Sequence, residues 1–332
     1  MTIDARPGLV HARETPTSWD DIGEVVERTA PGLFAGALPR IFRQPAGYLS
    51  PKQLAHRLVS AKIDEGVDYT SNVFASCATD AVRLRVPVWF LGREMGEALA
   101  STDLPEGFTI GDVPFPFPTW VLMLPEGLLV DGSGFSVPFI IASRMTPLDV
   151  QRRFASERDN PRANVDFYEK GLLLLAMYAD APGRRYGYKH FLQRTLLEPL
   201  SAEDFGAHNN TTDPVTADDD AFMRRALHVV VGAACIIANR PEFVEDERAL
   251  RRVKVKALGG KLDLVEPRWV GRNYKRQRER RDTVERLPGA KRSPHFRRGH
   301  WRRQRIGKGW TEERMIWIEP IFVAGATAEA TP

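Results

Sequence analysis

The chain has 332 residues, of which 43% are apolar, so it can bury a large core and does not belong to the disordered proteins. Its net charge is only +4, but residues 251–314 contain 22 Lys or Arg against 7 Asp or Glu. That segment therefore carries +15 and the remainder carries −11. This asymmetry predicts that an acidic partner, most simply nucleic acid, meets the basic end of the protein.

The cysteines and the N-terminus exclude two further classes. Cys77 and Cys235 lie among apolar or small residues, which predicts reduced, buried thiols and no disulfide framework. Residues 1–15 carry charges of both signs and no apolar run, so they are not a secretory signal. The apolar stretch Ala226–Ala238 is interrupted by His228 and is too short to span a bilayer. We therefore predict a cytoplasmic protein without a membrane partner.

Three helices and a strand are predicted in the first hundred residues. Helices are expected at 18–29 and 50–66, because a serine can cap each of them and apolar side chains follow at helical spacing. A strand is expected at 82–90 and a short helix at 94–100.

A proline-rich stretch comes next. Prolines stand at alternate positions in the first part of 113–125 and cannot donate to a β-ladder, so that part is predicted as an extended edge segment. Together with 128–130 and 137–141 it is expected to lead into an antiparallel meander. The glycine-rich Asp131–Gly134 suits a turn, while the alternative, a phosphate cradle, has no helix following it.

The middle of the chain contains two apolar segments. Residues 172–178 fit a core strand or a core helix, and their periodicity leaves both open. Residues 221–238 are apolar almost all round, which predicts a buried core helix. The acidic triplet Asp218–Asp220 before it is expected to stabilise the helix N-terminus, the alternative being half of a metal site.

These elements predict the α+β class. We expect a mixed N-terminal region with an antiparallel meander at 1–200, an acidic linker at 201–220, and a region at 221–325 that combines the apolar helix with a basic β-hairpin.

The hairpin is predicted from two β-compatible runs, 293–306 and 314–323, which flank a Gly307-Lys308-Gly309 turn. We expect it at a sheet edge or on a sheet that faces a partner. Strand alternation places Arg298, His300 and Arg302 on one face. The other face then holds Arg297, Trp301, Arg303 and Arg305.

Arginines with nearby tryptophans are typical of phosphate binding combined with base stacking, for which Trp301 and Trp310 are available. The residues predicted to bind nucleic acid, RNA before DNA, or an acidic protein or ribonucleoprotein are Arg297, Arg298, His300, Trp301, Arg302, Arg303, Arg305, Lys308, Arg272, Lys275 and Arg276.

Three alternatives remain open for these residues. The arginines could pair with the chain's own carboxylates. His295 and His300 have a spacing that zinc tolerates, but they lack a third ligand, so we predict no metal and no cofactor. A nuclease or hydrolase could use His300 as a base with Glu312 or Glu319, although a structural histidine explains the same residue.

Residues 295–304 and 316–323 resemble a C-terminal motif of poorly characterised proteins carried by phages, plasmids and other mobile elements. The proline-rich 114–125 and the apolar helix ending in Asn239-Arg240-Pro241 fit the same group. The group includes a type V-A anti-CRISPR protein that lowers production of the effector nuclease by acting on its nascent chain and transcript.

The resemblance implies a cytoplasmic binding protein without catalytic residues, acting near messenger RNA or translating ribosomes. Three functions are carried forward: a regulator that binds RNA or a ribonucleoprotein, possessing anti-CRISPR activity; a nuclease or hydrolase centred on His295 and His300; and a purely protein-binding inhibitor.

Overall fold

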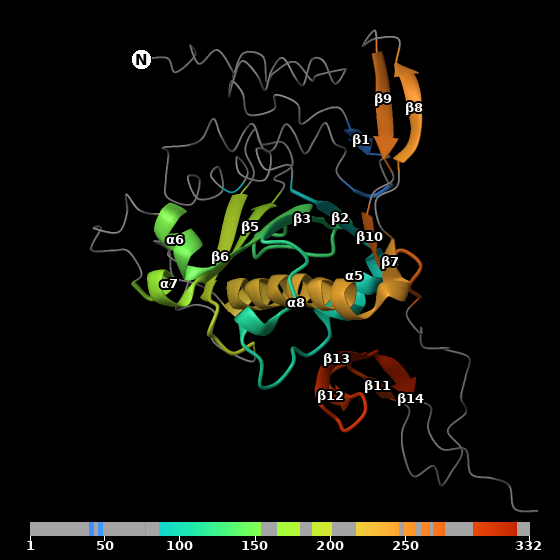
Figure 1. Ribbon diagram of the computed structural model, residues 1–332. Coiled ribbons are helices and arrows are strands. Elements are labelled where there is room, and N and C mark those ends of the chain that lie inside the picture. The colour runs from blue at the N-terminus through green and yellow to red at the C-terminus, as the bar shows by residue number, and fades with distance from the viewer. Residues whose placement is uncertain are drawn as a thin grey trace, which may run out of the picture.

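The computed structural model describes residues 40–42, 46–48, 77, 86–153, 165–179, 188–200, 217–245, 249–255, 260–265, 268–275 and 295–323 (Figure 1). The helices predicted at 18–29 and 50–66 and the basic residue Arg276 lie outside these ranges. Helices and strands are both present, and the α+β class is confirmed.

A mixed seven-stranded sheet forms the centre of the fold, in the order β6-β5-β4-β3-β2-β10-β7. Its strands are β2 (Val88–Leu91), β3 (Thr119–Met123), β4 (Phe139–Met145), β5 (Leu172–Ala179), β6 (Tyr188–Thr195), β7 (Val244–Glu245) and β10 (Arg268–Val270). Strands β3 to β6 form the predicted antiparallel meander. The sheet continues with β2, which is parallel to β3, and with β10, which is parallel to β2. It ends at β7, which is antiparallel to β10.

The apolar segment 172–178, which the sequence left open as strand or helix, lies in strand β5. All eight of its residues are buried, so both of its faces are covered. A continuous apolar run without alternation is what a strand in that position requires.

The proline-rich stretch leads into the central sheet. No strand forms in its proline-containing first part, 113–118, and β3 begins directly after Pro118. The strand then lies between β2 and β4 and not at an edge. The prolines therefore end where ladder donors are needed. Residues 128–130, predicted as a strand, form a bend that ends in an isolated bridge between Val130 and Ser136.

The turn predicted at Asp131–Gly134 is confirmed. The Asp131 Oδ1 atom accepts hydrogen bonds from the backbone N–H of Ser133 (3.0 Å) and Phe135 (2.8 Å). The N–H of Gly134 donates to the Asp131 carbonyl at 2.9 Å. These donors are used within the loop, which argues against the phosphate-cradle alternative.

Two helices pack together below the sheet as drawn in Figure 1, α5 (Arg93–Ala100) and the long α8 (Ala217–Asn239). They approach closely at Gly232, where an added Cβ would lie 2.8 Å from the Leu99 side chain. Helix α8 lies between the seven-stranded sheet and the C-terminal strands, which explains why it is apolar on all sides. The predicted buried core helix is confirmed.

Helix α8 begins at Ala217, inside the stretch predicted as the acidic linker, and residues 201–216 of that stretch lie outside the described ranges. The acidic triplet occupies its first turn, as expected. The 22 residues Asp218–Asn239 are long and apolar enough to cross a membrane by length and composition, and 67% of that window is buried inside the protein. The argument from the length of Ala226–Ala238 was therefore wrong, because the apolar helix is longer than that stretch. The buried core helix of a soluble protein passes the same test of length and composition.

The described fold also contains four short helices and a small sheet. The helices are η1 (Ile110–Asp112), α6 (Pro147–Arg153), α7 (Val165–Lys170) and η4 (Pro241–Phe243). The sheet contains β1 (Arg40–Phe42), β8 (Ala249–Val255) and β9 (Gly260–Val265), with β9 parallel to β1 and antiparallel to β8. Both cysteines are buried and neither belongs to a disulfide, as predicted.

The predicted C-terminal hairpin is confirmed as β12 (His300–Ile306) and β13 (Glu312–Ile318), joined by the loop 307–311. It forms a two-stranded sheet of its own and is not an edge of the central sheet. A second pair, β11 (His295–Arg297) and β14 (Ile321–Val323), continues it beyond a break in both strands. We refer to residues 295–323 as the C-terminal arm.

Candidate nucleic-acid interface

The base of the β12–β13 hairpin is a stacked pair of tryptophans. Trp301 and Trp317 lie opposite each other in the ladder, with ring centroids 6.2 Å apart and planes at 27°. They are 4% and 2% exposed. Trp301 was predicted to stack on bases, but it presents no accessible ring face because it belongs to the core. Trp310, the other tryptophan predicted for stacking, is 66% exposed at the hairpin tip.

Thr102 connects this pair to helix α5. The Trp317 Nε1–H donates to Thr102 Oγ1 at 3.3 Å, and the same hydroxyl donates to the Ala98 carbonyl at 2.7 Å. Thr102 is 1% exposed, so both bonds are shielded from water. The hairpin is thereby fixed to the C-terminal end of α5.

Gly299 explains the break between β11 and β12. An added Cβ would lie 2.7 Å from Thr102 Oγ1 and 2.9 Å from Pro320 Cδ, so only glycine fits there. Its carbonyl accepts a hydrogen bond from the Asp103 N–H at 3.0 Å. The arm therefore approaches the core with its backbone at this point.

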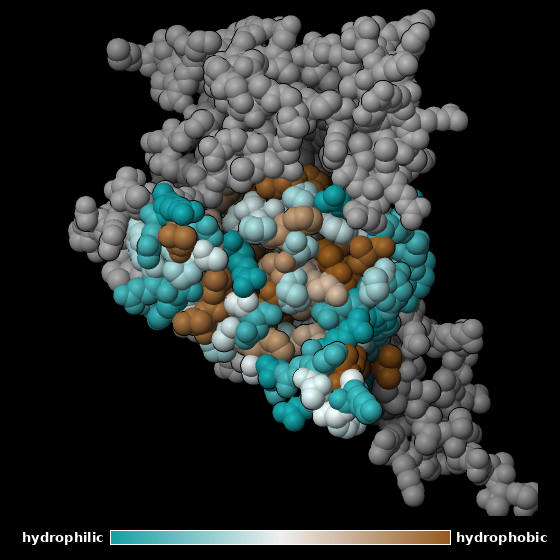
Figure 2. Space-filling model, in the orientation of Figure 1, coloured by the Kyte–Doolittle hydropathy of each residue, from teal (hydrophilic) through white to brown (hydrophobic). Residues whose placement is uncertain are grey.

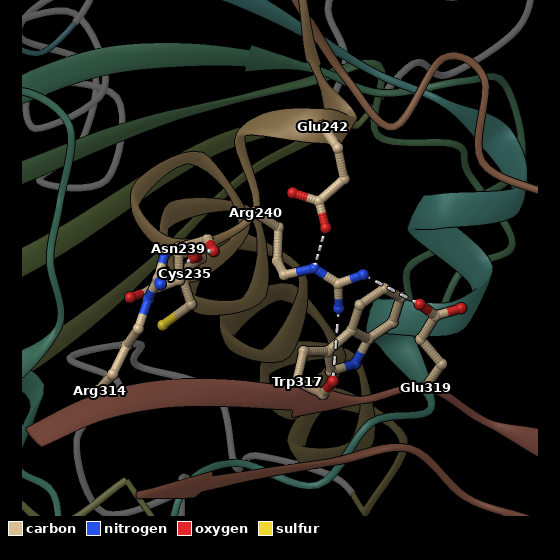
Figure 3. A network of polar contacts seen from close by, with 7 residues as sticks. All are labelled: Cys235, Asn239, Arg240, Glu242, Arg314, Trp317 and Glu319. Atoms are coloured by element: carbon tan, nitrogen blue, oxygen red, sulfur yellow. Dashed lines mark hydrogen bonds and ion pairs between the residues drawn. The ribbon is translucent and has the colours of Figure 1, made fainter. Parts of the chain in front are cut away.

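Arg240, directly after helix α8, is the centre of a second attachment (Figure 3). Its Nε is ion-paired with Glu242, and its Nη2 lies 3.2 Å from Glu319 Oε1. Its Nη1 donates to the Trp317 carbonyl at 3.4 Å. The guanidinium also lies 4.7 Å from the Phe243 ring centroid, within cation–π range. One side chain thus connects the helix end to strand β13.

Arg314 satisfies the C-terminal end of the same helix. Its Nη2 donates to the Asn239 carbonyl at 3.2 Å, while the Asn239 side chain donates to the Cys235 carbonyl at 3.0 Å. The last carbonyls of a helix lack intrahelical partners, and a cation is favoured beside them. The arm therefore caps α8 and is packed as part of the fold.

Two of the predicted binding arginines are paired internally. Arg303 Nε lies 3.1 Å and Arg305 Nε 3.5 Å from the carboxylate of Glu313 across the hairpin. The Arg303 guanidinium also lies 4.3 Å from the centroid of the Phe108 ring. For these two residues the structure matches the alternative of pairing with the chain's own carboxylates. Their common partner also confirms that they share a face.

The remaining exposed cations of the arm are differently placed. Arg297, Arg298, Arg302 and Lys308 are all exposed, and no carboxylate pairs with them among the residues that the structure describes. Among the described residues, Arg302 donates to Gln304 Oε1, at 2.9 Å. We call these four residues the cationic set. In Figure 2 the lower part of the described surface, where the arm lies in Figure 1, combines hydrophilic, intermediate and hydrophobic residues.

The predicted residues outside the arm form a separate group. Arg272 lies 3.3 Å from Glu245 and its guanidinium is 5.3 Å from the centroid of the Trp269 ring. Lys275 lies 3.5 Å from Glu94. Both are therefore paired within the fold.

His300 lacks the acidic partners considered for a nuclease. Glu319 is engaged with Arg240, and Glu312 lies opposite Ile306, six residues and about 20 Å further along the strand. The side chain of His295 lies outside what the structure describes. Within the described ranges, no three His, Cys, Asp or Glu residues gather as metal ligands.

One polar pair was not predicted at all. His190 Nε2 lies 3.0 Å from Asp131 Oδ2, and the His190 ring makes an edge contact with Phe222 of α8, with centroids 5.2 Å apart. The pair joins the Asp131 turn to strand β6 and to the helix. Nothing in the sequence relates these positions, which are 59 residues apart.

His228 should make the free energy of unfolding depend on pH. Burial lowers its pKa below the ordinary 6.5, against a hydrogen bond with the Thr102 backbone and the nearby Asp103 carboxylate. The folded protein therefore protonates His228 less readily than the unfolded chain does. We expect the free energy of unfolding to be constant above about pH 6.5 and to fall below it, by at most about 1.4 kcal/mol per pH unit.

Urea unfolding at pH 7.5, 6.5 and 5.5 measures this dependence in the wild type and in His228→Gln. The variant should lose part of the pH slope, and equal slopes in both proteins would contradict the assignment.

Comparison with known proteins identifies the family. The model of the anti-CRISPR type V subtype A2 family matches residues 89–325. The chain belongs to this family. The match begins in β2 and ends just after β14, so it covers the central sheet, α8 and the arm. The resemblance drawn from the C-terminal motif is thereby confirmed. No curated protein and no solved structure matches the chain.

Proposed function

We propose that this member of the anti-CRISPR family binds RNA through the cationic set of its C-terminal arm. The proposal rests on a difference in pairing among the cations of the arm. Arg303 and Arg305 share the single carboxylate of Glu313, whereas Arg297, Arg298, Arg302 and Lys308 are exposed, and no carboxylate in the described part of the chain pairs with them. Exposed cations that the fold leaves unpaired are available to phosphates.

The attachment of the arm supports the same function. Trp317, Thr102 and Arg240 hold the hairpin against the core, so its cations are carried on a fixed two-stranded scaffold. Less conformational freedom is then lost when a ligand binds. The +15 charge of residues 251–314 adds long-range attraction for a polyanion.

Within this proposal, the protein lowers the output of the type V effector by engaging its transcript, or a ribonucleoprotein that contains the nascent effector chain. It acts in the cytoplasm and is carried by a phage or plasmid. The family supports anti-CRISPR activity, and the RNA contact supplies the finer mechanism.

A purely protein-binding inhibitor is the second candidate, because the hairpin face that carries Arg302 also carries apolar side chains. Ile316 lies opposite Arg302 and Ile318 opposite His300, and both isoleucines are only half-buried. A protein with an acidic, partly apolar surface would fit this face.

The test is the salt dependence of RNA binding by the triple variant Arg298→Gln, Arg302→Gln, Lys308→Gln. Each phosphate contact on a single strand contributes about 0.7 to the slope of log K against log salt, so the slope should flatten by about two. Fluorescence anisotropy with a labelled RNA oligonucleotide at several salt concentrations measures it. The melting temperature should change little.

The matched control is Arg303→Gln with Arg305→Gln, which removes charge from residues already paired with Glu313. It should flatten the slope by less than the triple variant does and lower the melting temperature slightly. A triple variant with the slope and affinity of the wild type would refute the RNA contact. Recovery of one protein from a translating lysate after ribonuclease treatment, with RNA affinity absent, would favour the protein-binding inhibitor.

A further inference from the structure

The hairpin tip carries an aromatic side chain that the core does not use. Trp310 is 66% exposed, more than any other large apolar residue that the structure describes. The other described tryptophans, Trp89, Trp120, Trp269, Trp301 and Trp317, are at most 6% exposed. The fold therefore buries every described indole except the one at the end of the basic hairpin.

The backbone at this position is strained. Trp310 has a φ of 59°, and it is the one residue other than glycine with a positive φ in the described part of the chain. Its N–H donates to the Gly307 carbonyl at 3.2 Å, which closes the turn. The left-handed region costs an L-residue about 1 kcal/mol or more, and glycine or asparagine would reduce that cost. A bulky aromatic side chain at this position is therefore unfavourable for folding, which points to a role other than stabilising the fold.

The charges around the tip are mixed but favour an anion along the strand. Lys308 lies two residues before Trp310, Arg302 lies in β12 toward the base of the hairpin, and Arg298 lies in the break just before β12. Glu312, whose carboxyl carbon would lie 3.6 Å from a Cβ at Gly307, is the acidic neighbour of the loop. Strand β12 alone extends over about 20 Å, so a ligand that reaches both Trp310 and Arg298 must be extended.

From these observations we infer that the hairpin tip is a base-stacking platform that makes the arm selective for single-stranded RNA. The Trp310 indole stacks on one unpaired base while Lys308, Arg302 and Arg298 hold the phosphates that follow. This inference rests on the RNA-binding function proposed above and adds the strand state of the ligand.

The selectivity follows from how bases are exposed in the two forms of RNA. In a duplex both faces of a base are covered by its neighbours, and the major groove is too deep and narrow for side chains to read. An unpaired base offers a free face, and stacking on an aromatic side chain contributes about 1–3 kcal/mol per base. Phosphate contacts alone would not distinguish the two forms as strongly.

The experiment compares Trp310→Ala with the wild type, using a labelled single-stranded 12-nucleotide oligouridine and a 12-base-pair RNA duplex as probes, sizes of about one binding site. The variant should bind the single strand about 5- to 100-fold more weakly and the duplex with unchanged affinity. Its salt slope should equal that of the wild type, because no charge is removed.

Two further variants separate stacking from folding. Trp310→Tyr keeps an aromatic ring and should restore most of the affinity. Trp310→Asn suits the left-handed backbone and should keep or raise the melting temperature while binding as weakly as Trp310→Ala.

The outcomes distinguish this inference from the function on which it rests. If the triple cationic variant loses salt slope but Trp310→Ala binds the single strand like the wild type, the platform is refuted and RNA binding stands. Equal losses for single strand and duplex would also refute it. If neither variant changes RNA binding, both the stacking platform and the RNA contact are refuted.

Discussion

Replacing Trp317 by alanine should lower the free energy of unfolding by about 3–5 kcal/mol, the usual cost of truncating a buried tryptophan. Trp317 is 2% exposed and stacks on Trp301, and its indole N–H bonds to Thr102. Removing it opens a cavity and leaves the Thr102 hydroxyl with one bond fewer. Urea unfolding followed by far-UV circular dichroism measures the change.

The matched control is Trp310→Ala, which removes the same side chain from an exposed position and should change stability by less than about 1 kcal/mol. RNA affinity would fall in both variants, but only Trp317→Ala would lose it together with stability. A Trp317→Ala protein as stable as the wild type would show that the arm does not depend on this contact.

Arg240→Ala is expected to cost about 2–3 kcal/mol. The substitution removes the contacts with Glu242 and Glu319, the bond to the Trp317 carbonyl and the cation–π contact with Phe243. Single exposed ion pairs contribute little, but here several contacts converge on one partly buried guanidinium. Thermal unfolding of the variant, with the wild type as reference, measures the loss.

Arg314→Ala is the comparison for Arg240, because it also removes an arginine that contacts the end of α8 but through one bond to Asn239. Its cost should stay below about 1 kcal/mol. A double-mutant cycle between Arg240→Ala and Glu319→Gln should show a coupling of at least about 0.5 kcal/mol. Additive effects would mean that the pair at 3.2 Å is not an energetic contact.

Local patterns predicted the elements that depend on local physics. Helix α8 followed from its apolar surface and the acidic first turn, and the β12–β13 hairpin followed from two apolar-basic runs around Gly307 and Gly309. Strand alternation also placed Arg303 and Arg305 on one face. In each case the determining residues lie within a few positions of one another.

The candidate site could not be read to the same depth, because exposure depends on distant partners. Alternation gives the face of Trp301 but not that Trp317 stacks on it and that the ring is buried. Arg302 and Arg303 are adjacent in sequence, yet only Arg303 meets Glu313 and Phe108. The parallel pairing of β2 with β10 is equally invisible to local periodicity.

The bond between Thr102 and Trp317 joins residues 215 positions apart, which has a consequence for the order of events during synthesis. At about 5–20 residues per second, a ribosome needs roughly 10–40 s to add the residues between them. Throughout that interval the end of α5 exists without its indole partner, and α8 is made before Arg314 can cap it. The arm is therefore completed last, and the protein acquires its exposed basic hairpin in fixed form only when translation of the domain is nearly finished.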